Sequence, residues 1–237
     1  RYVGDWKNDV MEGEGDLFFS AETVGQAGTW YSGNWSNGEM KGYGTIYGPD
    51  SVIIQTGTYA NSKLIRGRKV TTNWSHDGDF ENGKANGKGT RTWSSGNQFT
   101  GNWKSGQQHG AGTMIYASGA RCQGTWVNGT LDGPCSFVSS DGDSYEGNMR
   151  DNQYEGYGRF RWVNGDVYSG HWEKSKMSGE GLFTSKDGWT FQGVWADGVA
   201  TGVQRNKEGK PSKGIEGQFD EYFNFTSNKD LRKRKSQ

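Results

Sequence analysis

The sequence predicts an all-β protein: an elongated, single-layer antiparallel sheet of about nine tandem β-hairpins, forming a twisted rod with a C-terminal cap. Three observations lead to this prediction. A 23-residue pattern recurs without a gap from Phe99 to Gly202. Large and small residues alternate within each copy, as side chains alternate between the two faces of a strand. Glycine supplies 40 of the 237 residues while only 30% are hydrophobic, so we expect a thin sheet with aromatic rings packed over glycines.

The repeat has fixed columns. The first column is mostly aromatic, the fifth is mostly tryptophan, and the third, twelfth and fourteenth are mostly glycine. In the regular block the first column reads Phe99, Cys122, Tyr145, Tyr168 and Phe191, and the fifth reads Trp103, Trp126, Met149, Trp172 and Trp195. Glycine within a strand permits close approach of another group. We expect that group to be an aromatic ring of the next repeat.

Two kinds of connection alternate along the block. Asp141-Gly142 and Asn164-Gly165 belong to a series of X-Gly pairs that recur every 23 residues. Such pairs favour two-residue type I′ hairpin loops, which need positive φ at both positions. We therefore expect the tight turns there, and longer loops at the other connections, such as Glu173 to Ser178.

The array is predicted to span residues 1–202, with two irregular regions. The first, 20–28, accommodates six residues beyond the period and is expected to be a longer surface loop. In the second, 55–75, Gln55 stands where the first-column aromatic residue is expected, and Arg66 and Arg68 stand where two glycines are expected.

The segment 203–228 reads as a degenerate half-repeat followed by a capping segment. The half-repeat consists of Ile215, Gly217 and Phe219, and a short amphipathic capping helix is predicted from the spacing of Phe219, Tyr222 and Phe223. A cap would cover the sheet edge at the end of the array. The last residues, 229–237, form a basic tail that we expect to be disordered.

Composition argues against several classes of function. The 27 basic and 27 acidic residues balance, which removes the broad attraction expected of a nucleic-acid-binding protein. No apolar run reaches the length of a membrane span, and no signal peptide is visible. Because Arg1 stands inside a repeat, we expect further residues before it in the whole protein.

The two cysteines, Cys122 and Cys135, stand in an aromatic column and a glycine column. We expect them to be small buried apolar residues, although a disulfide between them stays open because both lie on one face of the predicted hairpin. Two cysteines do not make a disulfide framework, so a cytoplasmic location is predicted.

No catalytic or metal-binding pattern emerges. The three histidines, His76, His109 and His171, share no column and show no metal-ligand spacing. No nucleophile elbow and no Gly-Lys-Ser/Thr phosphate loop occurs. We therefore predict a protein that is not an enzyme and needs no cofactor or metal.

The pattern Tyr-x-Gly-x-Trp-x-x-Gly-x-x-x-Gly-x-Gly resembles the MORN repeat (membrane occupation and recognition nexus). Residues 31–44 match every position, and residues 99–112 match with Phe in place of Tyr. The resemblance covers about residues 2–202. It implies a scaffold that holds a partner segment, often a helix, in a ciliary, cytoskeletal or membrane-junction assembly. Some similar proteins lie beside a catalytic domain, such as a lipid kinase or a SET-type methyltransferase.

From the resemblance and the long aromatic array we predict a scaffold or adaptor that binds a peptide or helix. We expect most rings to be core and the remainder to line a partner-binding groove. The candidate groove residues are Phe99, Trp103, Tyr116, Trp126, Tyr145, Phe160, Trp162, Tyr168, Trp172, Phe191 and Trp195.

Two alternatives stay open. One is a peripheral module that binds acidic phospholipids through Arg232, Lys233, Arg234 and Lys235, residues that also read as a solvated end or a nuclear address. The other is the regulatory portion of a larger enzyme. A homodimer through the ends of the array is expected if no cap covers them.

Overall fold

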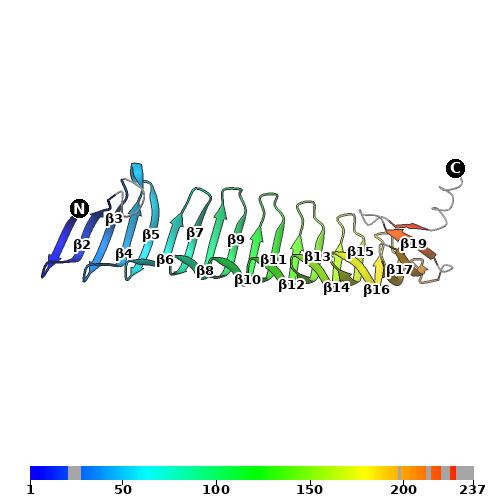
Figure 1. The fold of residues 1–237 in the computed structure, drawn as a ribbon. Coiled ribbons are helices and arrows are strands. Elements are labelled where there is room, and N and C mark those ends of the chain that lie inside the picture. The colour runs from blue at the N-terminus through cyan, green and yellow to red at the C-terminus, as the bar shows by residue number, and fades with distance from the viewer. Residues whose placement is uncertain (21–27, 197–198, 212–214, 220–224, 228–237) are drawn as a thin grey trace. The chain divides into compact units, whose positions relative to one another are not determined.

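The computed structural model describes residues 1–20, 28–196, 199–211, 215–219 and 225–227. The chain divides into two compact units, Arg1–Ala117 and Ser118–Gln237. Among the described residues each unit consists of β-strands without an α-helix, and the only helical element is the 3₁₀ turn Pro49–Ser51 (Figure 1). The predicted all-β class of tandem antiparallel hairpins is confirmed.

In the first unit every strand pairs antiparallel with the next in chain order. The strands are β1 (Tyr2–Lys7), β2 (Val10–Phe18), β3 (Trp30–Ser36), β4 (Glu39–Tyr47), β5 (Ile53–Ala60), β6 (Lys63–Val70), β7 (Trp74–Glu81), β8 (Lys84–Trp93), β9 (Gln98–Lys104) and β10 (Gln107–Ile115).

The second unit repeats this arrangement. Its strands are β11 (Arg121–Val127), β12 (Thr130–Val138), β13 (Ser144–Arg150), β14 (Gln153–Arg161), β15 (Val167–Glu173), β16 (Lys176–Thr184), β17 (Thr190–Ala196), β18 (Val199–Arg205), β19 (Ile215–Phe219) and β20 (Phe225–Ser227).

The two kinds of connection are the reverse of the prediction. The two-residue loop joins β15 to β16, where Lys174 and Ser175 have φ of 48° and 65°. The segment between β14 and β15, which contains Asn164-Gly165, is longer and has positive φ only at Gly165. X-Gly pairs occur at both kinds of connection: Asn37-Gly38 and Asn82-Gly83 form two-residue loops with positive φ at both residues, between β3 and β4 and between β7 and β8. The dipeptide alone therefore did not identify the tighter turn.

Aromatic rings do pack over glycines, but over those of their own hairpin. The Oη atom of Tyr145 lies 2.5 Å from the position of a Cβ on Gly147 and 2.4 Å from one on Gly158. Its hydroxyl donates a hydrogen bond of 2.8 Å to the carbonyl of Asn148. The register shifts between Gly147 and Asn148, so the tyrosine closes a β-bulge. The expectation that the covering ring comes from the next repeat was wrong.

The next repeat contributes its tryptophan instead. Trp172 donates from its indole nitrogen to the carbonyl of Gly158 at 3.3 Å, in the preceding repeat. Trp103 makes the corresponding bond to Gly89 at 3.0 Å. Each of these bonds ties one hairpin to its neighbour, because the donor and the acceptor lie in successive repeats.

The irregular repeat at 55–75 keeps the glycines of the third and fourteenth columns but has no glycine in place of the twelfth. Gly67 in β6 pairs with Gly57 on one side and Gly78 on the other. The assignment of Arg66 and Arg68 to glycine columns was wrong because this hairpin is one residue shorter before Gly67. Its register shift falls between Thr58 and Tyr59, one residue later than in most hairpins.

Several predicted segments fall wholly or partly outside the described residues. These are most of the loop 20–28, the basic tail 229–237, and Tyr222 and Phe223 of the proposed capping helix. Phe219, the first residue of that proposed helix, lies at the end of strand β19, which pairs with β18.

Cys122 and Cys135 are free and buried. Burial raises the pKa of the Cys122 thiol to about 12 and that of Cys135 to about 11. Cys135 occupies the position that is glycine in neighbouring hairpins, and Cys122 occupies the position of the ring that would cover it. A residue with a Cβ fits there because the large ring is absent.

Candidate partner-binding surface

The sheet of each unit has two unlike faces. We call the face that carries the first- and fifth-column side chains the ring face, and the opposite face the glycine face. In β13, Tyr145 and Met149 are buried whereas Glu146 and Asn148 are exposed, as strand alternation requires.

The predicted groove residues lie on the ring face or in its loops, and most are buried. The nine buried side chains are Phe99, Trp103, Trp126, Tyr145, Phe160, Tyr168, Trp172, Phe191 and Trp195. Tyr116 and Trp162 are half-buried. The rings pack edge to face, as Tyr168 does against Trp172 and Trp195 at centroid distances of 5.2 and 5.0 Å. The partly exposed rings that a groove would need are therefore absent at nine positions, and a role in partner binding stays a prediction.

One residue of each strand belongs to a single row that crosses the sheet. In the first unit these residues pair in sequence and all are glycines: Gly4, Gly15, Gly33, Gly44, Gly57, Gly67, Gly78, Gly89, Gly101 and Gly112. The rings cover this row on one side only. On the other side, the side chains that precede and follow each glycine stand as two flanking rows.

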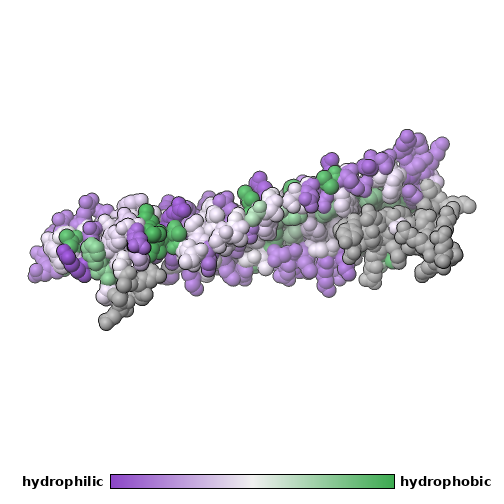
Figure 2. All heavy atoms as spheres, turned by 90° about the horizontal axis from the view of Figure 1, so that it is seen from above, coloured by the Kyte–Doolittle hydropathy of each residue, from purple (hydrophilic) through white to green (hydrophobic). Residues whose placement is uncertain are grey.

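A hollow of about 610 Å³ lies over this row between β6 and β10, and we call it the glycine trough. Its floor is formed by Gly67, Gly78, Gly89 and Gly101. Its other lining residues are polar apart from Ala111 and include Arg66, Asp77, Asp79, Lys88, Thr90, Thr100 and Asn102. On the face shown in Figure 2, hydrophobic residues appear as small groups separated by hydrophilic residues and residues of near-neutral hydropathy.

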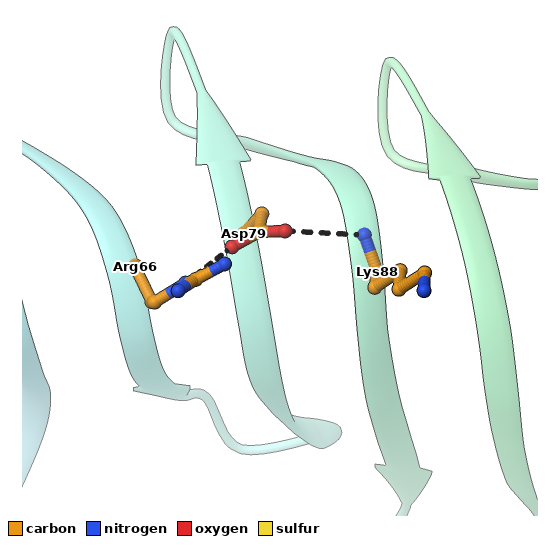
Figure 3. Close-up of polar contacts among 3 residues, drawn as sticks. All are labelled: Arg66, Asp79 and Lys88. Atoms are coloured by element: carbon orange, nitrogen blue, oxygen red, sulfur yellow. Dashed lines mark hydrogen bonds and ion pairs between the residues drawn. The ribbon is translucent and has the colours of Figure 1, made fainter.

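Asp79 organises one wall of the trough (Figure 3). Its Oδ1 accepts a hydrogen bond of 2.7 Å from Nε of Arg66 on β6, and its Oδ2 accepts one of 3.3 Å from the backbone N–H of Lys88 on β8. The hydrogen bond from Arg66 is the main reason why the pKa of Asp79 lies below its ordinary value. Both oxygens of Asp79 are thus engaged, and the Lys88 side chain points away from this contact (Figure 3).

Hydroxyl groups face each other across strands on the other side of the row. The side chains of Thr90 and Thr100 lie 3.0 Å apart, and those of Thr45 and Thr56 lie 2.9 Å apart. Each pair can share only one hydrogen between its two oxygens, so donor and acceptor capacity remains for an outside group.

The second unit carries two hollows over its own row. One of about 550 Å³ lies over Gly124, Cys135 and Gly147, and one of about 430 Å³ lies over Gly181 and Gly193. Exposed side chains of Tyr157, Leu182 and Val194 line the second hollow. Its edge also holds His171, whose ring meets that of Tyr157 edge on at 5.8 Å.

No cluster of three or more His, Cys, Asp or Glu side chains suited to a metal occurs in the part of the chain that the structure describes. The three histidines lie apart on β7, β10 and β15. Within the same residues, no helix is long and apolar enough to cross a membrane. The basic residues Arg232, Lys233, Arg234 and Lys235 lie outside the described ranges.

These hairpins, columns and bulges define an open-sheet repeat protein. A family model described as MORN repeat matches residues 2–20, 31–52, 76–98, 99–121, 122–144, 145–167 and 168–190, which together make up more than half of the chain. The chain therefore belongs to the MORN-repeat family. The irregular repeat at 55–75 is not among the matched segments, although its hairpin continues the sheet.

Comparison with curated proteins gives no match. Among solved structures, the chain is similar to the SAS-4 (dCPAP) TCP domain of Drosophila melanogaster, solved in complex with a proline-rich motif of Ana2 (dSTIL). The identity is 11%, the alignment covers 72% of this chain and 82% of that one, and the TM-score is 0.38. A likeness of this size says nothing about what the present chain binds.

Sequence reasoning missed the residues that line the trough. Asp79, Lys88 and Thr100 lie next to column glycines, and Asp or Asn recurs at the position of Asp79 as Asp5, Asn34 and Asn102, a column that the prediction did not use. The available signal was the alternation itself, which assigns the residues on either side of each glycine to the face opposite the rings.

Proposed function

We propose that this protein is a non-catalytic scaffold that binds an extended segment of a partner protein along the glycine trough. The observation behind the proposal is the contrast between the two faces. The ring face is filled by its own aromatic side chains, whereas the glycine face leaves a polar hollow of about 610 Å³ across β6 to β10.

The trough suits a segment that runs across the strands. Neighbouring strands lie about 4.8 Å apart, so each hairpin advances about 10 Å, the length of about three extended residues. Hydroxyls at Thr90 and Thr100, the amide of Asn102 and the cation of Lys88 offer hydrogen-bonding groups along such a path. The ring layer and the tryptophan bonds between repeats hold the platform in shape before a partner arrives, which reduces the entropic cost of binding.

Filling the trough tests the proposal. Thr100→Lys places a long charged side chain over the floor, and Ser94→Lys adds the same charge at an exposed position outside the trough. Proteins retained from cell lysate by the unchanged chain are compared with those retained by each variant. We expect a discrete protein to be retained by the unchanged chain and the Ser94 variant and lost from the Thr100 variant. Equal retention by both variants would reject the trough as the binding surface.

A cytoplasmic setting in a cytoskeletal, ciliary or membrane-junction assembly is part of this proposal and is supported by the family. The competing interpretation is a peripheral acidic-phospholipid-binding module. Capture by anionic vesicles that falls on deletion of 229–237 and at physiological salt, with no protein retained from lysate, would favour that interpretation. The proposal that the chain is the regulatory portion of a larger enzyme is tested by sequencing the coding region that flanks it.

A further inference from the structure

The ring face of the first unit contains one break in its apolar packing. In most hairpins an apolar residue pairs across the strands with the first-column residue: Leu17, Ile46, Met114, Phe137, Phe160 and Phe183. The third and fourth hairpins place Lys69 and Arg91 there instead. Their first-column partners are Gln55 and His76, so four polar residues stand in consecutive cross-strand positions on β5 to β8.

Of this group, His76 has the least satisfied hydrogen-bonding groups. Its side chain has 0% exposure, and it lies edge on to Phe80 and Trp103 with both centroids 5.0 Å away. Among the described residues, neither ring nitrogen has a hydrogen-bond partner. Buried polar atoms in folded proteins are almost always satisfied by protein, water or an ion.

Arg91 lies beside His76 and is held firmly. Its guanidinium carbon is 4.4 Å from the ring centroid of Trp74 and 4.3 Å from that of Trp103. One terminal nitrogen donates to the carbonyl of Gly106 at 3.4 Å, but Nε is buried without a partner in the described chain. Nε–H of Arg91 is thus enclosed in the ring layer, and two indole rings pack against the guanidinium.

No carboxylate neutralises this group within the described residues. The ion pairs found there are Arg66–Asp79, Arg68–Asp77 and Arg150–Glu155, and none includes Lys69 or Arg91. Asp77 and Asp79 alternate with His76 along β7 and therefore face the other side of the sheet. Lys69 and Arg91 thus place positive charge on the ring face without a paired carboxylate in the part of the chain that the structure describes.

A pocket of about 210 Å³ opens next to Lys69, where Gln55 stands in place of an aromatic ring. Tyr59, Leu64 and Phe80 provide apolar walls, and Lys63 also lines the pocket. Such a pocket can take an apolar side chain while the neighbouring cations take a carboxylate.

We propose that Lys69 and Arg91, which lie beside buried His76, form a carboxylate-binding site for an acidic segment of a partner protein, with an adjacent apolar side chain of that segment in the pocket beside Lys69. Charge complementarity selects the carboxylate, because Lys69 and Arg91 form no ion pair of their own within the described residues. This site lies on the face opposite the glycine trough, and its occupation does not depend on the function proposed above.

The test uses two short acetylated peptides, one of alternating Leu and Glu and one of alternating Leu and Gln. Binding to the whole chain is followed by NMR through the Nε–H resonance of Arg91. We expect the Leu–Glu peptide to shift that resonance and the Leu–Gln peptide to leave it unchanged. Added salt should weaken the binding, because the interaction is between charges.

Variants taken from the chain's own columns keep the ring layer packed. Arg91→Met copies Met114, Lys69→Ile copies Ile46, and His76→Phe copies Phe99. Each should fold, as circular dichroism will show, and Arg91→Met should weaken Leu–Glu binding by about tenfold or more. For that variant, binding is followed by Trp fluorescence. Lys104→Met is the matched control, since it removes one positive charge from an exposed position on the opposite face, outside the glycine trough, and should leave binding unchanged.

Three results would overturn the proposal. The first is equal binding of the two peptides, or no binding of the Leu–Glu peptide at millimolar concentration. The second is an equal loss of binding in the Lys104 and Arg91 variants. The third is an Arg91 resonance that moves with inorganic phosphate but not with the Leu–Glu peptide.

Discussion

The contact between Tyr145 and Gly158 is the unit from which this fold is repeated, and Gly158→Ala tests it. The backbone of Gly158 does not adopt positive φ, so alanine introduces no backbone strain there. Its methyl group would lie 2.4 Å from Oη, 2.6 Å from Cε2 and 2.7 Å from Cζ of Tyr145. Tyr145 is fully buried and stacks on Tyr154 with centroids 3.9 Å apart, so its ring has little room to retreat.

The expected cost has two parts. Forcing a methyl group into a filled core costs about 1–3 kcal/mol. Displacing the ring also lengthens the 2.8 Å hydrogen bond from Tyr145 to the carbonyl of Asn148, worth about 1 kcal/mol. We therefore expect the free energy of unfolding to fall by about 2–4 kcal/mol. Denaturant titration followed by tryptophan fluorescence measures this as a lower midpoint at unchanged slope.

A double-mutant cycle separates this contact from other effects of the methyl group. Tyr145→Cys removes the ring. Combined with Gly158→Ala, it resembles the pair Cys122 and Cys135 that the chain already contains, in which a residue with a Cβ takes the glycine position and a cysteine takes the ring position. In that background Gly158→Ala should cost less than about 1 kcal/mol, which gives a coupling energy of about 2 kcal/mol. A cost that is the same in both backgrounds would refute the reasoning.

Three further predictions concern the same ring layer. Tyr145→Phe keeps the ring and loses only the hydrogen bond to the bulge carbonyl, so the free energy of unfolding should fall by about 1 kcal/mol. A loss above about 3 kcal/mol would contradict the assignment of a single hydrogen bond to this hydroxyl. Cys122→Tyr alone should destabilise the chain by clashing with Cys135, and adding Cys135→Gly should restore stability, as thermal melts would show. Burial is the main cause that lowers the pKa of His76 from its ordinary 6.5 to about 4, so the unfolded chain takes up the proton first. The contribution of neutral His76 to the free energy of unfolding is thus fully present above about pH 6.5 and falls by about 3 kcal/mol toward pH 4. His76→Phe should flatten that part of the curve of unfolding free energy against pH.

The periodic part of the fold could be predicted because every hairpin repeats the same physical solution. Alternation in the columns fixed which residues share a face, and the glycine and aromatic columns indicated that rings pack over glycines. The sequence could not show which glycine each ring covers, because the glycine of the ring's own hairpin and that of the next hairpin occur at equivalent spacings. Geometry decides it: the Tyr145 hydroxyl reaches the bulge carbonyl three residues on.

The irregular positions show where pattern reading fails. In the third hairpin a one-residue deletion moved Gly67 out of its expected column, and Arg66 and Arg68 were then misassigned to glycine places. The trough was missed for a different reason. Its lining residues flank the columns on which the prediction was based, and only the folded sheet shows that Asp79 holds Arg66 and the backbone of Lys88 beside a glycine floor.

The most direct test of the proposed function is site-specific photo-cross-linking in cells. A benzophenone side chain is placed at Thr100 in the glycine trough, and in separate variants at Tyr116, one of the half-buried aromatic residues, and at Ser94 as an exposed control. We predict that Thr100 forms a discrete cross-linked product with another protein and that Ser94 does not. A product from Tyr116 alone, or none from Thr100, would contradict binding along the trough.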